Sequence, residues 1–221
     1  MKNPVKELHY IFYLPGTGGN FMLRLFSLSE DTQFLWIRGS CGCVPANNSL
    51  EEKLKWYSFK ESDASNWSSD AHLLPYGVYF QDPTVFYNPG TKLIAASHFL
   101  NHAPYQNTFN MLKRDYISEK YYYIDVDAET YTFMNRYLKI DLHEHNKVGG
   151  ESWQLKEKTL SYGIPVEPIY LQKMLDSDQG FLEEYHRVCA LMTLDPVSDN
   201  TALEFFHQWR KIRVDNPNLK S

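Results

Sequence analysis

Cysteine is scarce in this sequence. Only three cysteines occur among 221 residues, and two of them, Cys41 and Cys43, are separated by a single residue. An odd number at this spacing does not form the framework of a disulfide-stabilised secreted domain. The sequence therefore predicts a protein of the reducing cytoplasm.

The sequence also has few positive charges relative to negative ones, and it has no long hydrophobic run. The 22 Lys and Arg residues are outnumbered by 27 Asp and Glu, which gives a net charge of −5, and no segment gathers the cations into a patch. Such a balance predicts no nucleic-acid partner. The apolar run at residues 8–14 ends in a Pro-Gly pair and is too short for a membrane span or the hydrophobic part of a signal peptide. No membrane partner is expected either.

No linker rich in Pro, Gly or Ser divides the chain. The 43% hydrophobic content, with 16 Tyr, 13 Phe and 5 Trp, can supply one sizeable core. We therefore predict a single domain over residues 1–221, with insertions near 40–90 and 141–165, where regular apolar patterns are weak.

Short apolar runs alternate with helical patterns along the chain. Residues 8–14 predict a buried strand, and from Asn20 the apolar positions fall at helical spacing, with Arg24 on a different face. Further strands are predicted at 92–97, 120–126 and 168–171. A helix is predicted at 49–60, led by a capping box of Ser49 with Glu52. Two C-terminal helices are predicted from apolar residues that share one face, over 181–192 and 203–212. This alternation predicts an α/β fold with a mainly parallel sheet flanked by helices.

A glycine-rich loop joins the first predicted strand to the first predicted helix. Its sequence is Pro15-Gly16-Thr17-Gly18-Gly19-Asn20. Backbone N–H groups at the start of a helix converge on an anion, and glycine lets the backbone approach it closely. Thr17 and Asn20 add a hydroxyl and an amide. The loop therefore predicts a phosphate site, and the alternative is a tight turn without a ligand.

The loop is not a Walker A motif. No G-x-x-x-x-G-K-[ST] pattern occurs, and no lysine lies between Lys6 and Lys53. Because that lysine binds the β- and γ-phosphates in P-loop NTPases, its absence counts against ATP hydrolysis.

Three segments together resemble the sulfotransferases that use 3′-phosphoadenosine 5′-phosphosulfate. The loop PGTGGNFM is similar to the family's P-[KR]-[ST]-G-[TS]-[TS]-[WF]-L, with matches at Pro15, Thr17, Gly18 and Phe21. KLIAASHFLNHAP is similar to the family's strand that ends in a Thr-His pair, which here reads Ser97-His98. PIYLQKMLDSDQGFLEEYHRVCALMTLDP has the layout of the family's final strand and helix.

The resemblance implies a three-layer P-loop-type fold and the transfer of a sulfuryl group to a hydroxyl of a small molecule or glycan. 3′-Phosphoadenosine 5′-phosphosulfate would be the co-substrate, bound by the loop from Pro15 to Phe21, and no metal is expected. Gly16 stands where the family has a lysine, so Arg24, Lys92 or Arg136 would have to supply that charge. The family's 3′-phosphate ligands are also missing after the third strand, and Asn135 and Arg136 would take their place.

His98 is the candidate base for the acceptor hydroxyl. It follows a predicted parallel strand, where ligands of open α/β sheets bind, and imidazole titrates near neutral pH. A histidine that is merely hydrogen-bonded at a strand end is the alternative. His143 and His145 lack an evident third metal ligand, so we predict no metal site.

Two other functions remain open. A nucleotide kinase or NTPase is one, because the strand YYYID ends in Asp125, which could hold Mg²⁺. A non-catalytic nucleotide- or phosphate-binding protein is the other.

Overall fold

The computed structural model describes residues 7–13, 17–38, 40–44, 49–57, 92–97, 119–135 and 165–213. They contain a six-stranded sheet in the order β3-β2-β4-β1-β5-β6. Its strands are β1 (Glu7–Phe12), β2 (Thr32–Arg38), β3 (Ser40–Val44), β4 (Lys92–Ser97), β5 (Glu119–Asp125) and β6 (Val166–Tyr170). All neighbouring strands are parallel except β2 and β3. The predicted α/β class and mainly parallel sheet are thereby confirmed.

Strand β1 lies in the interior of the sheet, between β4 and β5. Its residues from Leu8 to Phe12 are all buried, as expected for a parallel strand covered on both faces. The predictions of β4, β5 and β6 are confirmed as well, with bounds that differ by no more than two residues.

The β2–β3 pair was not predicted. Strand β3 lies at the start of the segment that the sequence assigned to an insertion near 40–90, and β2 lies just before that segment. The pair forms one edge of the sheet. β3 reads SCGCV, which contains a central glycine and a single β-branched residue, so it carries little of the composition that marks a strand.

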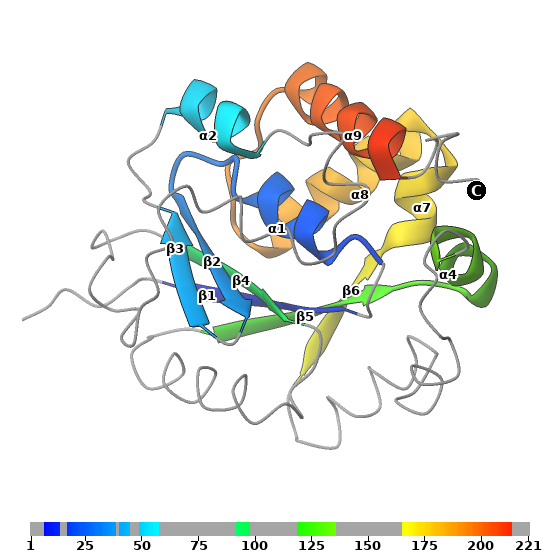
Figure 1. Cartoon of the computed structure of the whole chain (residues 1–221), viewed down its shortest axis with the longest axis horizontal. Helices are drawn as coiled ribbons and strands as arrows, with labels where there is room; N and C mark the ends of the chain where they lie inside the picture. Colours follow the sequence, from blue (N-terminus) through cyan, green and yellow to red (C-terminus); the bar gives the residue numbers. More distant parts are fainter. Residues whose placement is uncertain are drawn as a thin grey trace, which may run out of the picture.

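The described helices are α1 (Gly19–Phe26), α2 (Leu50–Tyr57), α4 (Ala128–Asn135), α7 (Leu171–Asp176), α8 (Asp178–Leu191) and α9 (Asp199–Arg213). Figure 1 shows α1, α8 and α9 together on one face of the sheet. None of the helices in the described ranges is long and apolar enough to cross a bilayer.

Helix α1 is more deeply buried than its sequence suggests. It packs against β1, β2 and β4 on one side and against α9 on the other. Arg24, which the sequence placed on a different face from the apolar residues, is only 2% exposed. Every residue of α1 except Asn20 is buried.

Aromatic rings join α1 to the C-terminal helices. The ring of Phe21 stacks on Trp209 with centroids 4.3 Å apart, and Phe181 stacks on Phe206 at the same distance. All four side chains are buried. Aromatic pairs at this separation add to the stability that burial itself provides.

Two histidine–aspartate pairs set the register of the antiparallel helices α8 and α9. His186 Nε2 lies 2.8 Å from Asp199 Oδ1, and His207 Nε2 lies 2.8 Å from Asp178 Oδ1. Each aspartate is the first residue of its own helix, where a negative charge is favourable. The two pairs therefore stabilise both helix starts and the hairpin between them.

Glu184 fixes the end of β6 to α8. Its buried carboxylate accepts hydrogen bonds from the backbone N–H of Tyr170 (2.8 Å) and from Arg187 Nε (2.8 Å) and Nη2 (2.5 Å). The Arg187 guanidinium lies 5.2 Å from the centre of the Tyr170 ring, and its hydrogen bonds to Glu184 raise its pKa.

Replacing Glu184 by alanine is expected to lower the free energy of unfolding by about 2 kcal/mol, because the partly buried Tyr170 N–H and the Arg187 guanidinium lose this buried acceptor. Urea unfolding measures the change. Glu183→Ala is the matched control, since this exposed neighbour contacts Lys173 and Gln179 on the surface. Equal losses in the two variants would contradict the role assigned to Glu184.

The predicted capping box of α2 is confirmed. Ser49 N–H donates to Glu52 Oε2 (3.0 Å), and Glu52 N–H donates to Ser49 Oγ (3.3 Å). These bonds satisfy backbone donors that the first turn of a helix leaves open.

We expect Ser49→Ala to destabilise the protein by about 1 kcal/mol, as loss of an N-cap does elsewhere. Thermal unfolding measures it. Ser49→Asp keeps a capping oxygen and should retain most of the stability, so an equal loss with aspartate would contradict the capping role.

Candidate anion-binding site

The glycine loop follows β1 at the carboxyl-terminal edge of the sheet. From β1 the chain passes through α1 to β2, which lies beyond β4 in the sheet order. β6, the next described strand after β5, lies on the opposite side of β5. β1 and β5 are neighbours in the sheet, so the chain leaves these two strands in opposite directions. Ligands of open α/β sheets bind in the crevice at such a point.

The backbone of the loop turns sharply into α1. Gly18 is the N-cap residue, with φ 77° and ψ 20°, in the left-handed region that favours glycine. A glycine N-cap has no side chain, so it cannot accept hydrogen bonds from the N–H groups of the first turn. Because α1 begins where β1 ends, the positive end of its dipole lies at the carboxyl ends of the strands, where an anion is favourable.

Packing explains why residues 18 and 19 are glycines. A Cβ atom at Gly19 would lie 2.2–2.4 Å from three ring atoms of Tyr13, and one at Gly18 would lie 3.0 Å from Trp209 Cζ2. The two glycines thus sit between an aromatic ring at the end of β1 and another in α9. Sequence reasoning assigned them to close approach by a phosphate and missed both rings, since nothing in the sequence connects Gly18 with Trp209.

The loop side chains lie in different surroundings. Thr17 is fully buried, and Asn20 is partly exposed, with its Oδ1 accepting a hydrogen bond from the Tyr13 hydroxyl (3.2 Å). Phe21 lies in the core, stacked on Trp209. Phe21 therefore orients the loop through packing, and Asn20 lies at its accessible side.

Arg24 is the candidate cation nearest to the loop in the sequence. It lies in the last turn of α1, five residues after Gly19 and about 7.5 Å farther along the helix axis, and its side chain is buried. Lys92 cannot supply the missing charge at the loop, because it begins β4 at the amino-terminal ends of the strands. There its Nζ forms an ion pair with Asp31 at 2.7 Å. Lys53 is buried, and its Nζ donates to the carbonyls of Ser29 and Thr32 beyond the far end of α1.

Several predicted site residues fall outside the described ranges: Pro15, Gly16, His98 and Arg136. Asn135 is the last residue of α4, and only its backbone is described. β4 ends at Ser97, in register with Phe12 of β1. His98 is the next residue in the sequence.

The end of β5 contributes acidic and phenolic groups beside β1. Asp125 is the last residue of β5, and Asp127 Oδ1 accepts a hydrogen bond from Thr130 N–H (2.6 Å) in the first turn of α4. Burial raises the pKa of Tyr123 to about 12, and Asp125 adds to the shift. The Tyr123 phenol therefore stays protonated at neutral pH. Among the residues with described side chains, no group of three or more His, Cys, Asp or Glu could hold a metal ion.

Comparison of the sequence with protein-family models and with curated proteins finds no match.

Proposed function

We propose that this protein binds the phosphate groups of a nucleotide at the loop between β1 and α1. The observation that carries the proposal is the position of the left-handed Gly18 and the start of α1 at the carboxyl edge, beside the diverging connections of β1 and β5. A P-loop-type three-layer architecture is part of the same proposal, and the central position of β1 supports it.

The proposed reaction is sulfuryl transfer from 3′-phosphoadenosine 5′-phosphosulfate to a hydroxyl of a small molecule or glycan. The bond between sulfur and the oxygen bridging it to the 5′-phosphate breaks, and a bond between sulfur and the acceptor oxygen forms. The hydroxyl proton passes to His98, and adenosine 3′,5′-bisphosphate leaves. Its 5′-phosphate would lie at the first turn of α1 with Arg24 within reach, and Asn135 and Arg136 would bind the 3′-phosphate.

Asp125 favours a second candidate, a nucleotide kinase or NTPase. Asp125 is the last residue of β5, the strand that pairs with β1. A carboxylate at this position could hold the Mg²⁺ ion that accompanies a bound nucleotide. The lack of a loop lysine between Lys6 and Lys53 weighs against it. Binding without catalysis is the third possibility.

A thermal-shift panel separates these candidates, because a ligand that binds only the native state raises the unfolding temperature. We expect adenosine 3′,5′-bisphosphate to stabilise the protein more than ADP does at the same concentration. A larger shift with ATP and Mg²⁺ than with either would favour the kinase. Equal shifts for the bisphosphate and ADP would remove the assignment of the sulfuryl donor, and no shift with any nucleotide would contradict nucleotide binding.

A further inference from the structure

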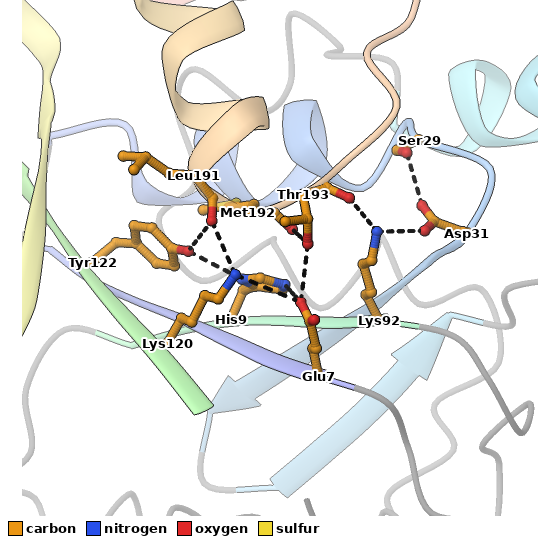
Figure 2. A network of polar contacts seen from close by, with 10 residues as sticks. All are labelled: Glu7, His9, Ser29, Asp31, Lys92, Lys120, Tyr122, Leu191, Met192 and Thr193. Atoms are coloured by element: carbon orange, nitrogen blue, oxygen red, sulfur yellow. Dashed lines mark hydrogen bonds and ion pairs between the residues drawn. The ribbon is translucent and has the colours of Figure 1, made fainter. Parts of the chain in front are cut away.

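A polar cluster lies at the amino-terminal edge of the sheet, opposite the candidate anion site. Figure 2 shows Glu7 and His9 of β1, Lys92 of β4, and Lys120 and Tyr122 of β5 reaching toward the turn that follows α8. The proposed function does not use these groups.

The cluster holds the 191–193 turn against the sheet. The carbonyl of Leu191 accepts hydrogen bonds from Lys120 Nζ (3.2 Å) and the Tyr122 hydroxyl (3.4 Å), and the carbonyl of Thr193 accepts one from Lys92 Nζ. The Thr193 hydroxyl lies 3.1 Å from Glu7 Oε2 and 2.6 Å from the carbonyl of Met192 (Figure 2). Three strands thus bind one turn.

The turn begins where α8 ends in a Schellman motif. The N–H of Thr193 donates to the carbonyl of Ala190 (3.1 Å), and the N–H of Leu194 donates to that of Cys189 (2.9 Å). Thr193 has φ 55°, the only positive φ among the described non-glycine residues. Because a β-branched residue is unfavourable in this left-handed region, the contacts of Thr193 to Glu7 and Lys92 help to hold it there.

His9 lies at the centre of these contacts. Its side chain is fully buried, with Nδ1 3.2 Å from the Tyr122 hydroxyl and Nε2 3.2 Å from Glu7 Oε2. The Nε2 contact is close but lacks hydrogen-bond geometry. A neutral imidazole has one N–H and an imidazolium has two, so proton uptake changes both contacts.

Proton uptake would also upset the charge balance. The carboxylates of Glu7 and Asp31 face the ammonium groups of Lys92 and Lys120, with Lys120 Nζ 3.9 Å from Glu7 Oε2. With His9 neutral, these four charges cancel. An imidazolium would compete for Glu7 Oε2, which Lys120 and Thr193 also approach, and would repel both lysines that bind the turn.

We propose that His9 makes this cluster an acid-sensitive latch, in which protonation of the imidazole releases the 191–193 turn and the end of α8 from the edge of the sheet. Glu7 Oε2 is the shared acceptor through which the proton acts.

The pKa of His9 gives the direction and the pH range. Burial is the largest cause and lowers this pKa from 6.5 to about 4, while Glu7 opposes the shift and Lys120 and Lys92 add to it. A histidine in the released state takes up its proton near pH 6.5. The closed latch is therefore fully favoured above pH 6.5 and loses stability as the pH falls from 6.5 toward 4.

Amide hydrogen exchange of the full chain tests the latch. The N–H groups of Met192, Thr193 and Leu194 donate to carbonyls of α8, so their exchange reports the turn. After correction for intrinsic rates, we expect their opening to increase about 20-fold from pH 7 to pH 5, while exchange in the middle of α8 stays unchanged. Equal opening at both pH values would overturn the proposal, as would simultaneous opening of the whole helix.

Two variants and one titration complete the test. His9→Asn removes the titrating ring and should abolish the pH dependence, whereas His186→Asn, which removes an exposed histidine of α8, should retain it. If His9→Asn does not fold, NMR titration of the His9 ring in the wild-type protein replaces it. We expect the Thr193 amide to shift together with that ring. Independent titration curves, or an unaltered pH response in His9→Asn, would contradict the latch.

Discussion

Alanine in place of Gly19 is expected to destabilise the protein by about 3 kcal/mol, the upper range for an overpacked core. The added Cβ would lie 2.2–2.4 Å from three atoms of the Tyr13 ring, and that ring cannot move freely because it is 93% buried at the end of β1. Either the ring or the start of α1 must shift. Denaturant unfolding of the two proteins measures the loss.

Tyr13→Leu provides the matched background for this prediction. With the ring removed, Gly19→Ala should cost less than half as much, and the difference is the coupling energy of the double-mutant cycle. An equal cost in both backgrounds would show that the ring is not the cause. Gly18 is unsuitable for the same test, because its φ of 77° strains any other residue regardless of Trp209.

His98→Asn is expected to reduce the turnover of a sulfuryl acceptor by about 10²-fold or more and to leave nucleotide affinity unchanged. Asparagine keeps a polar side chain but removes the group that takes the hydroxyl proton, and a general base contributes an effect of this size. Steady-state kinetics and calorimetric binding of adenosine 3′,5′-bisphosphate measure the two quantities separately.

His102 supplies the control for that experiment, since it lies only four residues further along the sequence. His102→Asn should turn over at close to the wild-type rate. A fully active His98→Asn would refute the proposed base, and a joint loss of turnover and nucleotide binding would assign His98 to binding instead.

The sequence predicted the elements whose local patterns are strong. The buried run of β1, the apolar spacing of α8 and the capping box at Ser49 and Glu52 are all determined by neighbouring residues, so they could be recognised without tertiary information. The parallel arrangement followed from the alternation of strands and helices.

Features that depend on contacts between residues far apart in the sequence were not predicted. Arg24 is buried in a helix that packs against both the sheet and α9, and the glycines at 18 and 19 accommodate the rings of Trp209 and Tyr13. Lys92 was a candidate for the missing loop charge until the register of β4 placed it at the opposite edge. Spacing along one helix or strand carries no information on any of these contacts.

The central claim is that a nucleotide phosphate binds at the start of α1. The most direct measurement is a two-dimensional ¹H–¹⁵N NMR titration with adenosine 3′,5′-bisphosphate, followed at the backbone amides of Gly18, Gly19 and Asn20. Binding at the loop predicts saturable shifts that are largest at these amides, together with a shift of the Trp209 indole N–H, because its ring lies against Gly18. Unchanged loop amides at saturating bisphosphate, or shifts confined to another part of the molecule, would contradict the assignment.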